Sequence, residues 1–178
     1  MKPTNGLMLV FDLETDGLLD DVTKIHCLVI YDSEDDSTCI YNDQGSQEPI
    51  VRGVQRLEDA DVLVGHNILG FDLPVIQKLY LWFNPQAMVL DTLLLSRLYH
   101  TDLLEVDQKR NVEYMPLPLY GRHSLASWGH RLGEYKGAFG QSTDWQEWSP
   151  EMETYCAQDV NVTTKLCDHF HKYLSGSY

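Results

Sequence analysis

The chain has 178 residues, 43% of them hydrophobic and 22% charged, which suits a single domain with its own core. The apolar fraction excludes an intrinsically disordered chain, and no apolar run approaches the roughly 20 residues of a membrane-spanning helix. A net charge of −14 excludes a protein that holds nucleic acid through a broad basic surface. If nucleic acid is the ligand, something other than fixed positive charge must screen its phosphates.

The N-terminal apolar run at residues 7–11 stops at Asp12, so it is too short for the core of a secretory signal. The cysteines form no C-x-x-C pair, so a zinc site is not expected and the thiols should be reduced and mostly buried. They are Cys27, Cys39, Cys156 and Cys167. These features predict a soluble cytoplasmic protein.

The first half of the chain predicts a meander of strands followed by alternating helices and strands. Apolar runs separated by turns predict five strands, at residues 7–12, 25–31, 38–41, 61–65 and 88–90. Amphipathic spacing predicts helices at residues 49–58, 71–80 and 92–100. The acidic run 32–36 is expected to form a turn.

The second half begins with residues 101–123, whose weak periodicity predicts an irregular loop. Ser124 is expected to cap a helix that ends near Leu132, and residues 133–143 to form a glycine-rich loop. Ser149, followed by proline, marks the start of a last helix that runs to about residue 174. The order of elements predicts one α/β domain over residues 1–178, with a mixed five-stranded sheet flanked by helices.

Carboxylates stand in three segments that this architecture would bring together. Asp12 and Glu14 lie two apart at the end of the first strand, so both point to one face. Asp72 follows the fourth strand, and Tyr155 and Asp159 lie one turn apart on the last helix. Converging carboxylates repel one another without counterions, and Mg²⁺ and Mn²⁺ prefer such oxygen ligands. Two such ions suit phosphodiester hydrolysis and would let an acidic protein accept a phosphate.

These segments resemble the three motifs of the DEDD 3′→5′ exonucleases, which have the ribonuclease H-like fold. Asp12-Leu13-Glu14-Thr15 resembles the first motif, Asn67–Phe71–Asp72 the second and Tyr155–Asp159 the third. The tyrosine of the third motif is typical of the subgroup that includes polymerase proofreading domains and ribonuclease D. Residues 91–98 and 123–137 are also similar to the proofreading domain of family A DNA polymerases from T-seven-like podoviral phages.

The resemblance implies a role for each matching residue. The carboxylates would hold two divalent ions, Mg²⁺ or Mn²⁺, and Tyr155 would orient the attacking water; the carboxylates are Asp12, Glu14, Asp72 and Asp159. Five residues would contact the terminal nucleotide: Thr15, Leu18, His66, Asn67 and Phe71. The implied substrate is a single-stranded or frayed DNA 3′ end. The implied partner is a DNA polymerase, in cis or in trans, and no membrane is involved.

The expected function is therefore that of a metal-dependent 3′→5′ exodeoxyribonuclease that releases 5′-mononucleotides and proofreads for a phage polymerase in the host cytoplasm. Two alternatives stay open. One is a 3′→5′ exoribonuclease of the ribonuclease D type, because the shared motifs do not decide the sugar. The other is a non-catalytic nucleic-acid-binding scaffold on the same fold. For single residues, Asp72 alone could be a helix cap, Leu18 and Phe71 could belong to the core, and Arg122 and His123 could be scattered surface charges.

Overall fold

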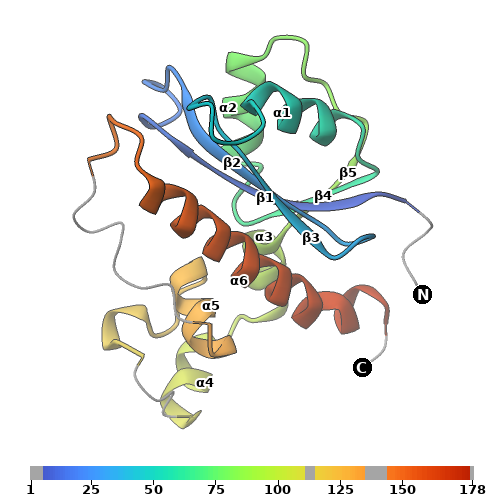
Figure 1. Cartoon of the computed structure of the whole chain (residues 1–178). Helices are drawn as coiled ribbons and strands as arrows, with labels where there is room; N and C mark the ends of the chain where they lie inside the picture. Colours follow the sequence, from blue (N-terminus) through green and yellow to red (C-terminus); the bar gives the residue numbers. More distant parts are fainter. Residues whose placement is uncertain (1–5, 111–114, 135–143, 177–178) are drawn as a thin grey trace.

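A five-stranded sheet separates two layers of helices in the computed structural model, which describes residues 6–110, 115–134 and 144–176 (Figure 1). The strands are β1 Met8–Thr15, β2 Ile25–Asp32, β3 Ser37–Tyr41, β4 Val62–Gly65 and β5 Met88–Asp91, in the order β3-β2-β1-β4-β5. The strands β3, β2 and β1 pair antiparallel, and β1, β4 and β5 pair in parallel. The predicted mixed sheet and α/β class are thus confirmed, and the acidic run 32–36 includes the turn between β2 and β3.

The helices are α1 Ile50–Glu58, α2 Asp72–Leu79, α3 Thr92–Tyr99, α4 Leu103–Arg110, α5 Leu125–Leu132 and α6 Pro150–Leu174, with a short 3₁₀ turn η1 Leu117–Leu119. Figure 1 shows α1 and α2 on one side of the sheet and α6 on the other, with α4 and α5 beyond α6. None of the helices in the described part of the chain is long and apolar enough to cross a membrane.

The prediction of an irregular loop over residues 101–123 is wrong, because α4 and η1 lie within it. Helix α4 buries Leu103 and, one turn later, the charged residue Asp107. The carboxylate of Asp107 forms an ion pair with Arg131 of α5 at 2.8 Å. An amphipathic helix is recognised in a sequence by apolar residues at its buried positions. Because Asp107 occupies one of those positions in α4, the sequence pattern did not indicate a helix. Of the predicted glycine-rich loop, Gly133 ends α5 with a φ of 75°, while residues 135–143 lie outside the described residues.

Strand β1 divides its side chains between the two helical layers. Leu9, Phe11 and Leu13 are buried in the core that α1 and α2 cover. Val10, between them in the sequence, is buried with Cys156 and other residues of α6. The period of two along a strand thus assigns the even-numbered positions of β1, which include both carboxylates, to the α6 face.

Candidate active site

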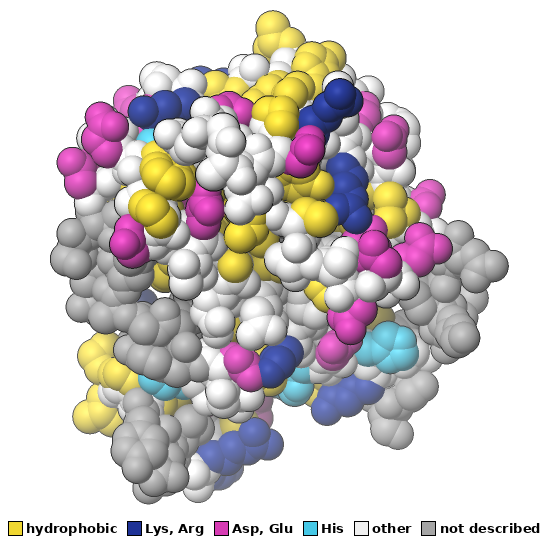
Figure 2. Space-filling model, viewed as in Figure 1, with side chains coloured by type: hydrophobic (Ala, Val, Ile, Leu, Met, Phe, Trp, Pro, Cys, Tyr) yellow, Lys and Arg dark blue, Asp and Glu magenta, His cyan; other side chains and the backbone are white. Residues whose placement is uncertain are grey.

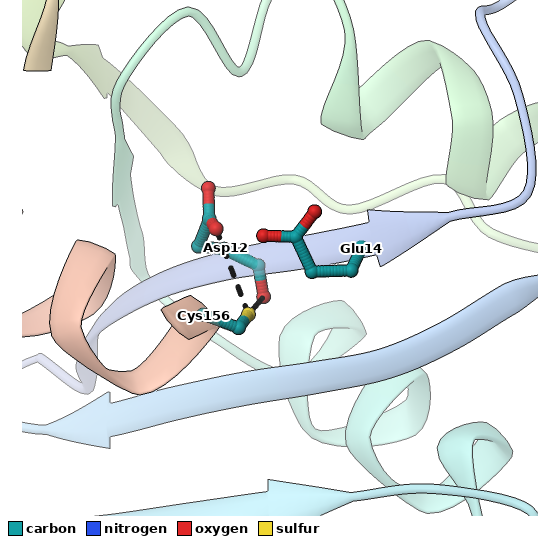
Figure 3. A group of neighbouring side chains, drawn as sticks. All are labelled: Asp12, Glu14 and Cys156. Atoms are coloured by element: carbon teal, nitrogen blue, oxygen red, sulfur yellow. Dashed lines mark hydrogen bonds between the residues drawn. The ribbon is translucent and has the colours of Figure 1, made fainter. Parts of the chain in front are cut away.

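Strand β1 contributes the first two carboxylates of the site. Asp12 is opposite Val29, and Glu14 is opposite Cys27, in the antiparallel ladder with β2. The regular register ends between Glu14 and Thr15, directly after the second carboxylate. Both acidic side chains are half-buried, and in Figure 3 the carboxylate of Glu14 is turned toward the side of Asp12. The backbone of a central strand therefore fixes the two acids next to each other.

Helix α6 packs against β1 and β2 and supplies the third motif. Asp159 is buried with 6% of its surface exposed, whereas Tyr155, one turn earlier, is half-buried. The ring of Tyr155 meets the ring of Trp145 edge to face, with centroids 6.4 Å apart. The backbone oxygen of Trp145 is in turn 2.8 Å from Nε2 of the buried His26 on β2. No pattern in the sequence predicts this support for Tyr155, because Trp145 lies in a non-helical segment before α6.

A thiol joins the β1 carboxylates. Cys156 of α6 is fully buried, and its Sγ donates to the backbone oxygen of Asp12 at 3.3 Å and to Asp12 Oδ2 at 3.5 Å (Figure 3). Ligand atoms of Asp12, Glu14 and Cys156 all lie within 4.8 Å of one another. Burial raises the pKa of the Cys156 thiol well above its usual value, and neighbouring Cys27, Asp12 and Glu14 raise it further. The sequence predicts Cys156 only as a buried thiol, although it directly follows Tyr155 of the third motif.

Asp72 is the first residue of α2 and exposes only 3% of its surface. Phe71 is the residue at the cap position, so the helix-cap interpretation of Asp72 is wrong. Burial is the main reason that the pKa of Asp72 is raised to about 7, and the charges of Asp91 and Asp159 add to this effect. Hydrogen bonds from the backbone N–H groups of Leu13 and of Asp72 itself act in the opposite direction. Asp72 thus lies against the backbone of Leu13, the residue between Asp12 and Glu14.

A second buried acid, Asp91, organises the segment that leads to Asp72, a role that the sequence pattern did not indicate. Its Oδ1 accepts the backbone N–H of Asn67 at 2.9 Å, and its Oδ2 accepts that of Leu69 at 3.1 Å. Oδ1 also caps α3 through the N–H of Leu93 at 2.9 Å. These bonds hold Asn67 in the left-handed region, at a φ of 66°, where a non-glycine residue needs support. The aspartate at the end of β5 therefore shapes the loop between β4 and α2.

The five predicted nucleotide contacts have different surroundings. Leu18 exposes 75% of its surface, so it does not belong to the core. Phe71 is half-buried and packs against the core under α1 and α2. Thr15 is buried, and its hydroxyl donates to the backbone oxygen of Gly17 at 2.8 Å. Their roles toward a nucleotide stay predictions.

The remaining two predicted contacts, His66 and Asn67, line an open pocket of about 480 Å³. Its other walls come from α3 and from the segment that enters α5: Leu93, Arg97, Arg122, His123, Ser124 and Leu125. His66 Nδ1 is 2.9 Å from the hydroxyl of Thr92, which itself donates to the backbone oxygen of Gly65. The pocket therefore brings Arg97 and Arg122, which are 25 residues apart in the sequence, next to the second motif. These two positive charges lie together in a chain whose net charge is −14.

The donor set fits divalent cations. Asp72 Oδ1 is buried and has no hydrogen-bond partner among the described residues. A buried carboxylate oxygen without a partner is costly, and neighbouring carboxylates increase the cost unless a cation is bound. Carboxylate oxygens are the ligands that Mg²⁺ and Mn²⁺ prefer. The residues that could hold such ions are Asp12, Glu14, Asp72 and Asp159.

The fold agrees with the family comparison. Residues 9–171 match the family model of the RNase H superfamily, and the chain belongs to that superfamily. It is 34% identical to the DNA-directed DNA polymerase of Enterobacteria phage T3 and 32% identical to that of Escherichia phage T7. In each case the match covers 90% of this chain but only 26% of the polymerase, so the chain spans about a quarter of the length of these relatives.

Solved structures show the same fold. The chain superimposes on Brucella melitensis NrnC with a TM-score of 0.63 and 21% identity, over 95% of this chain and 75% of that one. A second structure of that protein, with bound Mg²⁺, gives a TM-score of 0.63 and 20% identity, over 94% and 73% of the two chains. The EXO domain of Aedes aegypti Nibbler gives a TM-score of 0.56 and 14% identity, over 92% and 80%.

Proposed function

We propose that the chain is a metal-dependent 3′→5′ exodeoxyribonuclease that removes 5′-mononucleotides from DNA 3′ ends with two divalent ions, and that residues 1–178 form one exonuclease domain. The observation that carries the proposal is the buried Asp72 of α2, which lies within the influence of the charge of Asp159 and against the strand residue between Asp12 and Glu14, and which keeps an oxygen without a partner among the described residues. Buried, mutually repelling acids disfavour folding and are typical of sites that bind metal ions or catalyse reactions.

Each acid has a distinct place in this proposal. Asp12 would contribute to holding both ions, Glu14 and Asp159 would hold the one beside the attacking water, and Asp72 would hold the other. Divalent ions bound there supply a water of lowered pKa and positive charge near the scissile phosphate. The hydroxyl of Tyr155 orients the attacking water by a hydrogen bond, and the edge contact with Trp145 holds its ring in place.

The pocket beside the second motif supports binding of a strand end. Arg97 and Arg122 place two guanidinium groups there, and guanidinium groups bind phosphates bidentately. His66 and Asn67, which belong to the segment that leads to Asp72, also line this pocket, and we place the terminal nucleotide beside them. The exposed apolar side chain of Leu18 follows β1 and is available to insert between the last two bases.

The choice of DNA rests on the two phage polymerases, whose names specify a DNA-directed DNA polymerase. The chain matches about a quarter of each polymerase, so we propose that it works with a polymerase, either as part of a longer chain or as a separate partner. Proofreading of a phage polymerase, in the host cytoplasm, follows as the biological role.

The decisive experiment incubates the purified chain with end-labelled single-stranded DNA or RNA, in Mg²⁺, Mn²⁺ or EDTA, and resolves the products by length. We expect a ladder that shortens from the 3′ end of DNA, release of 5′-mononucleotides, and no reaction in EDTA. Faster degradation of RNA would replace the proposal with the ribonuclease D type of exoribonuclease. Binding without hydrolysis under all metal conditions would leave the non-catalytic scaffold.

A further inference from the structure

The β1 carboxylates have a sulfur atom as their neighbour, which an all-oxygen magnesium site does not require. Cys156 Sγ lies 3.3 Å from the backbone oxygen of Asp12 and 3.5 Å from its Oδ2. The side chain is fully buried between α6 and the sheet, so it cannot turn away into solvent. Glu14 completes a group whose ligand atoms all lie within 4.8 Å of one another (Figure 3).

These distances suit a small tetrahedral cation. A Zn–S bond of about 2.3 Å and a Zn–O bond of about 2.1 Å, at a tetrahedral angle, separate the sulfur and oxygen atoms by about 3.6 Å. The observed separation of Cys156 Sγ and Asp12 Oδ2 is 3.5 Å. Two of the three donors therefore already stand at the spacing that one shared ion imposes, and the third is close by.

We propose that Asp12, Glu14 and Cys156 form a mixed oxygen and sulfur site for a soft divalent cation of the Zn²⁺ or Cd²⁺ class. The thiol releases its proton to solvent when the ion binds, because the thiolate is the ligand. Three protein ligands leave the fourth tetrahedral position open to water. Mg²⁺ does not use the sulfur, since it prefers oxygen ligands in an octahedral arrangement.

The surroundings of the site point to a cation independently of the thiol. Asp72 exposes 3% of its surface, and its Oδ1 has no hydrogen-bond partner among the described residues. It lies against the backbone of Leu13, between Asp12 and Glu14 in the sequence. The buried Asp72 oxygen is thus left without a partner among the described residues beside this point of β1, and a bound cation would balance its charge.

Occupancy by a soft ion has a consequence for the proposed nuclease, and this part of the inference rests on the proposed function. The soft ion and Mg²⁺ share Asp12 and Glu14, so they bind competitively. A thiolate and two carboxylates hold the soft ion in a tetrahedral arrangement rather than the octahedral one that Mg²⁺ prefers, so that ion replaces Mg²⁺ without supporting the same reaction. Low concentrations of a soft cation are therefore expected to inhibit hydrolysis, and excess Mg²⁺ to relieve the inhibition.

The test uses the metal-free chain and Cd²⁺ alone, followed by the ultraviolet thiolate-to-Cd²⁺ charge-transfer absorption. We expect one saturable absorption change in the wild type and none from this site in Cys156→Ala or Cys156→Ser. Cadmium affinity should fall at least roughly tenfold in both variants, as is typical when the support of a bound metal is removed. Mg²⁺ affinity, measured by competition, should change less than Cd²⁺ affinity.

Two matched variants, Cys167→Ala on the same helix and Cys27→Ala on β2, control for other thiols. Cys167→Ala should keep the absorption change and the affinity of the wild type. If Cys156→Ala keeps the absorption change and the wild-type cadmium affinity, the inference is overturned. If Cys27→Ala loses them while Cys156→Ala keeps them, the ligand is Cys27 instead. The readout needs no substrate, so a chain that binds Cd²⁺ through Cys156 but hydrolyses nothing would refute the proposed function and not the cation site.

Discussion

Asp12 is the residue on which the candidate site depends most. It is adjacent to Glu14 on the same face of β1, and Cys156 donates to both its backbone and its side chain. The two-ion proposal assigns it to both ions, whereas each other acid belongs to one. Substitutions at this position therefore separate a catalytic role from a structural role most clearly.

Asp12→Asn keeps the shape of the side chain and removes its charge. We expect hydrolysis to fall about 10³-fold or more, because a bound ion contributes several kcal/mol of transition-state stabilisation. Without metal, the melting temperature should stay level or rise, since repulsion among the acids is relieved. Single-turnover hydrolysis and calorimetry measure the two effects. Glu151→Gln, at an exposed acid of α6, is the control, and near-normal turnover in Asp12→Asn would contradict the assignment.

Tyr155→Phe tests the orientation of water. We expect the rate constant to fall by roughly 10²-fold, at the lower end of the range for a positioned acid or base group, while metal affinity hardly changes. Isothermal titration with Mn²⁺ and pre-steady-state hydrolysis provide the two readouts. Tyr173→Phe makes the same change on α6 away from the acids and should behave as the wild type. Wild-type kinetics in Tyr155→Phe would show that this tyrosine is structural.

At the scale of elements, the ion pair between α4 and α5 is the most deeply buried in the described part of the chain. Arg131 binds Asp107 through two hydrogen bonds, of 2.9 and 2.8 Å, and the N–H of Gly121 adds a third at 2.8 Å. Burial alone would raise the pKa of Asp107, but the hydrogen bonds from Arg131 and Gly121 outweigh it and lower the pKa. The ion pair joins α4 to α5. The residues just before α5 line the pocket that contains Arg97 and Arg122, which we call the arginine pocket.

Asp107→Asn should lower the free energy of unfolding by about 3 kcal/mol near pH 7, because it leaves a buried arginine without its counter-charge. The pKa of Asp107 is lowered in the folded state, so its contribution is present above the unfolded value of about 4. That contribution disappears as the pH falls through the folded pKa, and the two unfolding curves should then converge. Urea denaturation from pH 3 to pH 7 measures this difference.

Glu105→Gln is the matched control on α4, since its partner Lys109 lies 3.6 Å away and both side chains are exposed. Its effect should stay below about 1 kcal/mol at every pH. A constant difference between wild type and Asp107→Asn across the pH range would show that the carboxylate charge is not the source of the stability.

Local patterns predicted the elements whose inward positions are apolar. The apolar run before Asp12 and the serine–proline start of the last helix predicted β1 and α6, and in the structure α6 packs on the face of β1 that carries Asp12 and Glu14. Contacts between distant residues escaped prediction. Asp91 acts through backbone N–H groups more than 20 residues away, and Cys156 meets Asp12 across 144 positions. Contacts between residues this far apart leave no periodic pattern in the sequence, so they could not be predicted from it.

At the scale of the whole molecule, the charge is distributed unfavourably for holding a long strand. Figure 2 shows acidic and basic side chains interspersed over this face rather than a continuous basic stripe. The arginine pocket offers local phosphate contacts only, in a chain of net charge −14. Few neutralised phosphates mean that little holds the strand once its end leaves the site.

We therefore predict distributive hydrolysis, with a preference for single-stranded or mismatched 3′ ends, because opening a matched duplex end costs a few kcal/mol per base. In a trap experiment, excess unlabelled DNA is added after the first encounter, and the nucleotides removed per binding event are counted. We expect one or very few, and a rate that falls steeply with salt. Long runs on matched duplex would contradict this prediction. Arg122→Ala should weaken binding and leave the rate of the bound complex nearly unchanged.

The distance in sequence between β1 and α6 also determines when the chain can become active. The ribosome delivers Asp12 early and Asp159 only after most of the described residues, and neither segment holds the full set of acids by itself. A nascent chain, or a fragment that ends before α6, has the β1 carboxylates but lacks Asp159 and Tyr155. On the proposed assignment, hydrolysis requires the docking of the last helix, so an unfinished or truncated copy without α6 is expected not to cleave the nucleic acids around it.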